Sequence, residues 1–216
     1  MTRPPAGRPC ASLTERPEPV RRYGTIVRME APEVLLTERL ILRRWRPDDE
    51  AVMAAINRDP NVVQLLNRPM DADAVGAFFH LVQHHWATHG FGPWAVQERQ
   101  HSEGPMVGFA GLAYPPPFLA AAGVGPELGW RLARSAWGHG YATEAAIAAR
   151  DDAIGRLGCD DLYSIIHPDN ERSRRVATKI GMRIARQIDN PAIGRAVDVW
   201  TLRERWERGE SGGRAG

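Results

Sequence analysis

This 216-residue chain has no long apolar run and only two cysteines. No stretch approaches the ~18 apolar residues that a membrane-spanning helix needs. The first 22 residues are rich in proline and arginine and have no apolar core, so we expect neither a secretory signal nor a membrane partner. Of the two cysteines, Cys10 lies in this N-terminal stretch and Cys159 in the body of the chain. We therefore expect no disulfide and a reducing, cytoplasmic compartment.

A strong excess of one charge is also lacking. The chain has 28 basic and 26 acidic residues, a formal net charge of +2, and its arginines are scattered or concentrated near the ends. No basic stripe is interleaved with aromatic residues, so we predict no nucleic-acid partner. No histidine, cysteine and carboxylate cluster has the spacing of metal ligands, so we predict no metal.

The remaining composition is that of a globular protein with two tails. We expect residues 1–33, which are rich in proline and arginine, and residues 207–216, which end the chain, to be flexible. Residues 34–206 form one uninterrupted series of elements, with no linker. Their number suits a single domain with one core.

Apolar periodicity predicts a mixed α/β domain with about seven strands and about four helices. The expected order is a strand, two helices, three strands, a helix, a strand, a helix and two strands. The expected strands are residues 35–44, 92–99, 105–114, 126–133, 161–167, 182–188 and 195–203. The expected helices are residues 47–58, 71–89, a run with Thr143 and Glu144 in its first turn that extends to Leu157, and residues 170–180.

The stretch WRLARSAWGHGYATEA, residues 130–145, reads as a strand end, a glycine turn and a helix start. Gly138 and Gly140 permit positive φ and a close approach by a ligand. Thr143 and Glu144 fall in the first helical turn. Unpaired N–H groups and the helix dipole at such a turn suit a phosphate group, although the same pattern also occurs in plain tight connections.

A second segment has the same strand-to-helix character. HPDNERS, residues 167–173, follows the next predicted strand along the chain and opens a helix. Two neighbouring parallel strands that both lead into helix starts form a crevice at their carboxyl ends. We therefore expect a ligand with its phosphates on the glycine turn and polar contacts from Asn170 and Ser173.

These segments together resemble the GNAT superfamily of acetyl-CoA-dependent N-acetyltransferases. WGHGYATEA, HPDNERSRRVATKIGM and LLTERLILRRWRPDD are most similar to its RimJ/RimL-like branch, which acetylates the N-termini of ribosomal proteins. The resemblance implies the GNAT fold with splayed fourth and fifth strands, and acetyl-CoA as the acyl donor. It also implies a primary amine as acceptor, either a protein N-terminal α-amine or a small-molecule amine. A homodimer is left open.

The resemblance further implies where acetyl-CoA binds. The family's pyrophosphate loop, Q/R-x-x-G-x-G/A, falls on residues 135–140, and this chain departs from it with Ser135 at the first position. The backbone of the fourth strand and the Asn of the later motif would hold the pantetheine arm. The predicted acetyl-CoA contacts are Trp130, Leu132, Arg134, Trp137, Gly138, His139, Gly140, Tyr141, Ala142, Thr143, Asn170 and Ser173.

Two residues are expected to carry the proton transfers. Glu127, on the fourth strand, lies where relatives often place the carboxylate that accepts a proton from the amine, although a surface glutamate is an equal reading. Relatives often use a tyrosine to protonate the leaving thiolate, and here that position holds Ala177. Ser173 is the predicted substitute, with Tyr141 as a weaker candidate, and Ser173 also suits a plain helix-capping role.

Two alternative functions share parts of this sequence pattern. The missing tyrosine leaves open a non-catalytic acyl-CoA-binding or regulatory module on the same fold. A dinucleotide-binding domain would need a third glycine where this chain has Thr143, so it is discounted.

Overall fold

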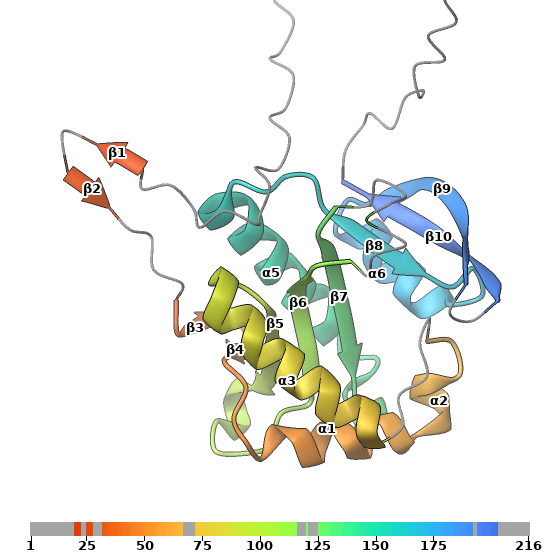
Figure 1. The fold of residues 1–216 in the computed structure, drawn as a ribbon. Coiled ribbons are helices and arrows are strands. Elements are labelled where there is room, and N and C mark those ends of the chain that lie inside the picture. Colours follow the sequence, from red (N-terminus) through yellow and green to blue (C-terminus); the bar gives the residue numbers. More distant parts are fainter. Residues whose placement is uncertain are drawn as a thin grey trace, which may run out of the picture.

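The computed structural model describes residues 20–22, 25–27, 32–66, 72–115, 120, 125–191 and 194–202 (Figure 1). Its strands are β1 (Val20–Arg22), β2 (Thr25–Val27), β3 (Val34–Leu36), β4 (Leu40–Arg43), β5 (Pro93–Glu98), β6 (Gly108–Ala113), β7 (Glu127–Leu132), β8 (Tyr163–Ile166), β9 (Arg183–Asn190) and β10 (Arg195–Thr201). Its helices are α1 (Asp49–Arg58), α2 (Pro60–Val63), α3 (Ala72–His89), α5 (Tyr141–Leu157) and α6 (Glu171–Lys179), with short 3₁₀ turns at Arg99–His101 and Arg134–Ala136.

Strands β3 to β10 form one eight-stranded sheet in the order β3-β4-β5-β6-β7-β8-β10-β9. Neighbouring strands are antiparallel except β7 and β8, which are parallel. The mixed α/β prediction is therefore confirmed. Strands β1 and β2 pair with each other in a separate antiparallel ladder.

The eighth strand arises where the sequence pattern predicted a single strand, residues 35–44. The structure folds this stretch into a hairpin, with β3 and β4 joined at Thr37. The Thr37 hydroxyl accepts a hydrogen bond from the N–H of Leu40 at 3.0 Å, and the Thr37 N–H donates to the Leu40 carbonyl at 3.0 Å. A threonine side chain thus closes the turn, which alternation of apolar residues alone does not reveal.

Helices cover both faces of the sheet (Figure 1). On one face α5 packs over β6 and β7 and contacts α6, while α3 lies across the opposite face together with α1. Val75, Phe79, Val82 and Trp86 of α3 are buried, and Phe78 is half-buried against the same core. Helix α2 was not predicted from the sequence.

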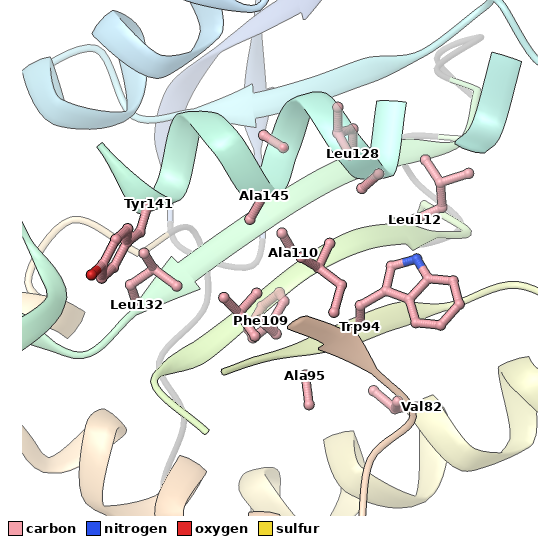
Figure 2. Packing of buried hydrophobic residues seen from close by; sticks show 14 of the residues in the cluster. Val82, Trp94, Ala95, Phe109, Ala110, Leu112, Leu128, Leu132, Tyr141 and Ala145 are labelled. Carbon is pink, nitrogen blue, oxygen red and sulfur yellow. The ribbon is translucent and has the colours of Figure 1, made fainter. Parts of the chain in front are cut away.

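The predicted small-residue face of α5 is also confirmed. Ala146, Ala149 and Ala153 are buried on this helix, and Figure 2 shows its Ala145 pointing toward the strands that carry Ala110 and Leu128. Alanine side chains leave room for the helix axis to lie close to the sheet. The N-terminal turn of α5 is therefore held close to the carboxyl end of β7.

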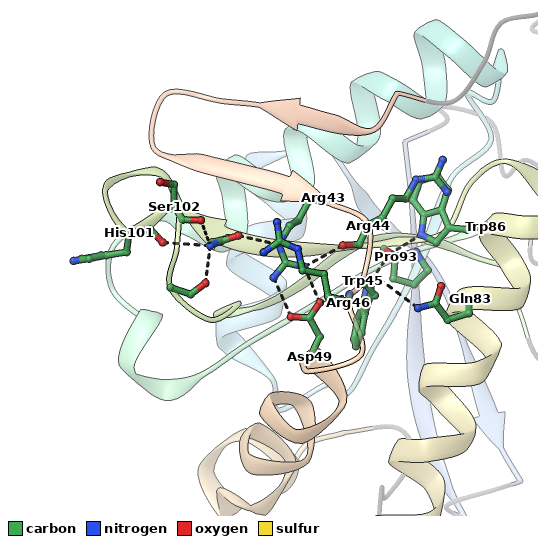
Figure 3. A network of polar contacts seen from close by, with 12 residues as sticks. Arg43, Arg44, Trp45, Arg46, Asp49, Gln83, Trp86, Pro93, His101 and Ser102 are labelled. Carbon is green, nitrogen blue, oxygen red and sulfur yellow. Dashed lines mark hydrogen bonds and ion pairs between the residues drawn. The ribbon is translucent and has the colours of Figure 1, made fainter.

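A buried charged network fixes α1 to the sheet (Figure 3). The guanidinium of Arg43 on β4 donates to both carboxylate oxygens of Asp49, at 2.7 and 2.9 Å, and its Nε donates to Gln97 on β5 at 2.8 Å. Asp49, expected only to complement the helix dipole, is thus an ion-pair partner. Such a bidentate pair fixes orientation as well as distance, so it holds the helix that leads into α2.

Strands β7 and β8 pair at one point and then diverge. The only register between them is Glu127 opposite Tyr163. Just beyond it the Ser164 hydroxyl donates to the Leu128 carbonyl at 2.6 Å, so a side chain replaces the next rung of the ladder. This confirms the predicted splay of the fourth and fifth strands of the motif.

Candidate functional site

A cavity of about 440 Å³ occupies the space where β7 and β8 part. One wall is the glycine turn and α6, and the other is α2 with the residues that follow it. The lining residues are Asn61, Val62, Leu65, Leu66, Trp130, Arg131, Leu132, Ala136, Trp137, Gly138, Gly140, Tyr141, Ala142, Thr143, Asn170, Arg172, Ser173, Arg175, Val176 and Lys179. The cavity thus joins the two segments that the sequence singled out, about thirty residues apart.

The backbone of β7 presents alternate residues to the cavity side. The carbonyls of Pro126 and Leu128 bond to β8, and the N–H of Ala133 donates to Val107, which precedes β6. Backbone groups alternate in direction along a strand of an antiparallel ladder. Trp130 and Leu132 therefore turn their backbone groups away from β6, toward the gap. The Trp137 indole N–H donates to the Leu132 carbonyl at 3.0 Å, so only the backbone N–H of Leu132 is left for a ligand.

The glycine turn carries a row of available backbone donors. Gly138 and Gly140 adopt φ values of 83° and 81°. Among the described residues, the N–H groups of residues 138–142 make no hydrogen bond, whereas those of Thr143 and Glu144 donate back to the Gly140 carbonyl. Five consecutive free donors at the N-terminus of a long helix form an anion-binding concavity. A Cβ on Gly138 would meet nothing within 4 Å, so ligand atoms have room there.

The start of α6 supplies polar groups on the opposite side. The Asn170 side chain caps this helix by accepting from the Ser173 N–H at 3.1 Å. Asn170 is therefore the capping residue, and the capping role considered for Ser173 falls to it instead. The Ser173 hydroxyl makes no hydrogen bond within the described chain and lies on the cavity lining, which leaves it available to a ligand.

The charge of the lining is positive. Arg131, Arg172, Arg175 and Lys179 line the cavity, and its described lining includes no aspartate or glutamate. Arg172 lies over the Trp137 ring at 4.0 Å and donates to the Asn61 carbonyl at 3.3 Å, so it connects the glycine turn, α6 and α2. A cationic lining next to free N–H donors favours a ligand with several negative charges.

Glu127 lies where β7 and β8 pair; it is half-buried and is not among the residues that line the cavity. Burial raises the pKa of Glu127 to about 7, against the opposing effects of a hydrogen bond from the Ile165 N–H and of the nearby Arg131 charge. The same environment lowers the pKa of Arg131 to about 10. A carboxyl group that titrates near neutral pH can accept a proton at physiological pH and release it again.

Most of the residues predicted to contact acetyl-CoA line this cavity, but two do not. Arg134 and His139 are exposed beside it, and the His139 carbonyl accepts a hydrogen bond from Arg39. Ala177 is fully buried in the core, so the side chain at that position does not reach the cavity. Tyr141 does line it. The aromatic residues Trp86, Phe91 and Trp94 belong to the core and do not line the cavity.

Sequence reasoning missed one wall of the cavity and its basic residues. Arg172, Arg175 and Lys179 recur at helical spacing on α6, and that stripe was a usable signal for an anion-facing helix. The residues from Asn61 to Leu66 offered no such signal, because they reach the cavity only through the packing of α1 and α2 on the sheet.

The part of the chain that the structure describes contains no candidate membrane span and no candidate metal cluster. No helix there is both long and apolar enough to cross a membrane. No group of three or more histidine, cysteine, aspartate or glutamate side chains is placed to hold a metal ion in that part of the chain.

Comparisons with known proteins agree with this geometry. Residues 39–183 match the family model of the acetyltransferase (GNAT) domain. The uncharacterized protein YkkB of Bacillus subtilis is 28% identical over 170 residues, which cover 74% of this chain and 91% of YkkB. An acetyltransferase structure from Agrobacterium tumefaciens has a TM-score of 0.66 and 28% identity, covering 77% of this chain and 92% of its own. Mycobacterium smegmatis RimJ, solved in complex with CoA-disulfide, has a TM-score of 0.58 and 17% identity, covering 74% and 80%.

Proposed function

Because the chain belongs to the GNAT acetyltransferase family, we propose that it transfers an acetyl group from acetyl-CoA directly to a primary amine. The observation that carries this proposal is the row of free N–H groups at residues 138–142, which opens on the cavity between β7 and β8. No other described segment combines unpaired backbone donors, a cationic lining and a strand edge.

The residues present fit acetyl-CoA. Its diphosphate would accept hydrogen bonds from the free N–H groups of the glycine turn, with Arg172, Arg175 and Lys179 supplying positive charge. Its pantetheine arm would lie along β7, bonding the cavity-facing backbone of Trp130 and Leu132. The thioester would then lie toward the end of the gap where Glu127 is located.

The proton transfers follow from this placement. The amine nitrogen attacks the thioester carbonyl carbon, and Glu127, directly or through a water molecule, accepts a proton from it. A backbone N–H of β7 stabilises the oxyanion. The carbon–sulfur bond then breaks, and the leaving thiolate takes a proton from the Ser173 hydroxyl as that hydroxyl takes one from solvent, which also receives the proton held by Glu127. Cys159 is fully buried, so a covalent acyl-cysteine route has no accessible nucleophile there.

The pKa of Glu127 favours one of the two acceptor classes. Peptide α-amines have a pKa of about 8, whereas lysine-like alkyl amines have a pKa of about 10. Proton transfer to a carboxylate of pKa about 7 is therefore uphill by roughly one pKa unit from a peptide α-ammonium group and by roughly three pKa units from an alkyl ammonium group. We therefore propose a protein or peptide N-terminal α-amine, as the motifs of the RimJ/RimL-like branch also suggest. The likeness to Mycobacterium smegmatis RimJ is one of fold and adds nothing on the acceptor.

The test is release of CoA thiol with a matched amine panel. The panel holds peptides with free N-termini, the same peptides with blocked N-termini and a single lysine, and small alkyl diamines. We expect turnover with the free N-termini and loss of turnover on blocking them. Equal rates with the blocked peptides would overturn the acceptor assignment. Tight acetyl-CoA binding without turnover on any amine would support the non-catalytic binding module instead.

A further inference from the structure

Glu144 is an unexpected residue beside an anion-binding turn. It lies in the first turn of α5, two residues beyond the last free N–H, where a carboxylate repels a bound diphosphate. Its side chain is only 16% exposed and points away from the cavity into a shallow groove outside α5. The groove also contains Thr37 and Arg39, from the β3–β4 turn.

Four contacts join this carboxylate to the β3–β4 turn. One oxygen accepts from the Thr37 hydroxyl at 2.6 Å and from the Arg39 N–H at 2.8 Å. The other accepts from Nε and Nη2 of the Arg39 guanidinium, each at 2.7 Å. The same guanidinium donates through Nη1 to the His139 carbonyl at 2.8 Å. Arg39 therefore binds both the carboxylate at the start of α5 and the carbonyl of the peptide bond that precedes Gly140.

That second contact sets the direction of a peptide plane. In a trans peptide the carbonyl of one residue and the N–H of the next point opposite ways, and no described peptide is cis. Arg39 holds the His139 carbonyl on the groove side of the turn. The Gly140 N–H therefore faces away from the groove, toward the side where Gly138 lines the cavity. Because glycine at φ 81° has broad conformational freedom, this peptide would otherwise be free to rotate.

We propose that Arg39 and Glu144 are positioning residues that hold the glycine turn in its diphosphate-binding conformation. The inference rests on the proposed function, because it assumes that the turn binds the diphosphate of acetyl-CoA. Surface ion pairs contribute little to stability, and the Arg39 side chain is 45% exposed. The contacts therefore matter through the geometry of the turn rather than through the stability of the fold.

The inference predicts a defect confined to the diphosphate. Arg39→Met should weaken CoA binding, measured by calorimetry, by roughly tenfold, the value of about one charge-assisted hydrogen bond. The kcat/KM with S-acetylpantetheine, a donor that lacks the diphosphate, should stay at the wild-type value. Arg39→Lys keeps the positive charge but lacks the planar guanidinium with its several N–H donors, so it should not restore CoA binding. Equal losses with both donors would overturn the proposal.

Glu144→Gln separates positioning from simple charge. It removes a negative charge near the diphosphate, so an electrostatic account predicts tighter CoA binding, whereas loss of the Arg39 anchor predicts weaker binding. Tighter or unchanged binding overturns the proposal. If the Arg39 variants do not fold, Thr37→Val removes the hydroxyl that donates to Glu144 and that accepts from the Leu40 N–H in the β3–β4 turn, and it should still weaken CoA binding a few-fold.

Arg156→Met is the matched control on the same helix. Arg156 also forms a bidentate pair with a carboxylate, that of Asp152, at 2.7 and 2.6 Å, and also donates to a backbone carbonyl, that of Gly90. It lies at the far end of α5, so its loss should leave CoA affinity unchanged. A loss equal to that of Arg39→Met would mean that the helix is generally weakened, against the proposal. Wild-type protein that binds no CoA would refute the proposed function itself.

Discussion

Replacing Glu127 with glutamine tests the proposed chemistry most directly. The change keeps the shape of the side chain and its ability to accept from the Ile165 N–H, but removes the group that titrates. With a pKa of about 7, roughly a tenth of the carboxyl groups are ionised at pH 6 and nine tenths at pH 8. A rate that needs the ionised form should therefore rise about tenfold over this interval.

The assay is kcat/KM from CoA thiol release between pH 6 and pH 9, expressed per concentration of neutral amine. This normalisation removes the titration of the acceptor. The wild type should rise with slope one below pH 7 and then level, while Glu127→Gln should be flat. General-base catalysis contributes about 10²–10⁴-fold, so the variant should be slower by at least about a hundredfold at pH 8, with unchanged CoA affinity.

Two results would refute this reasoning. A variant within a few-fold of the wild-type rate would remove Glu127 from the mechanism. A pH break near 7 that persists in the variant would assign the titration to another group. Glu98→Gln is the matched control, because Glu98 is a glutamate at the end of β5 that pairs with His101 outside the cavity. It should keep both the rate and the pH break.

Three further predictions concern the turn, the acid and the cost of burying Glu127. Gly138→Asp should raise the Kd for acetyl-CoA, measured by calorimetry, roughly a thousandfold, since like charges ~4 Å apart near a surface repel by about 4 kcal/mol. Gly158, at the other end of α5, also has a positive φ and open space around it, so Gly158→Asp should leave this Kd unchanged. Ser173→Ala should lower kcat by roughly a hundredfold with the KM for acetyl-CoA retained, and an unchanged kcat would exclude it as the acid. The pKa of Glu127 is raised from 4.5, so its contribution to stability is full below pH 4.5 and lost as the pH rises through 7. Between pH 5 and pH 8, the free energy of unfolding in urea of Glu127→Gln should therefore gain up to about 3 kcal/mol relative to the wild type. A difference that does not change with pH would contradict the burial of this carboxyl group.

Some of the site follows from local sequence alone. Gly138 and Gly140 adopt the positive φ values that the turn pattern indicated, and the free N–H groups follow from a helix beginning there. Gly181, with φ 87°, follows α6 in the left-handed conformation in which glycine commonly ends a helix. These features depend on residues within one turn of each other, so the sequence displays them directly.

The hairpin at Thr37 and the role of Glu144 could not be predicted in the same way. The pattern in residues 35–44 is satisfied by one strand, and the turn depends on one hydroxyl. Glu144 reads as an ordinary first-turn acid until Arg39, more than a hundred positions earlier, is placed beside it. The charge of a residue is visible in the sequence, but its partner across the fold is not.

Periodicity and short motifs were enough to predict the alternation of strands and helices, the glycine turn and the family resemblance. Only the tertiary structure decided which groups face the gap between β7 and β8. The splay turns the backbone of Trp130 and Leu132 toward the gap, and burial raises the pKa of Glu127 to about 7. Both depend on how distant elements exclude water and leave backbone groups unpaired, which no local pattern records.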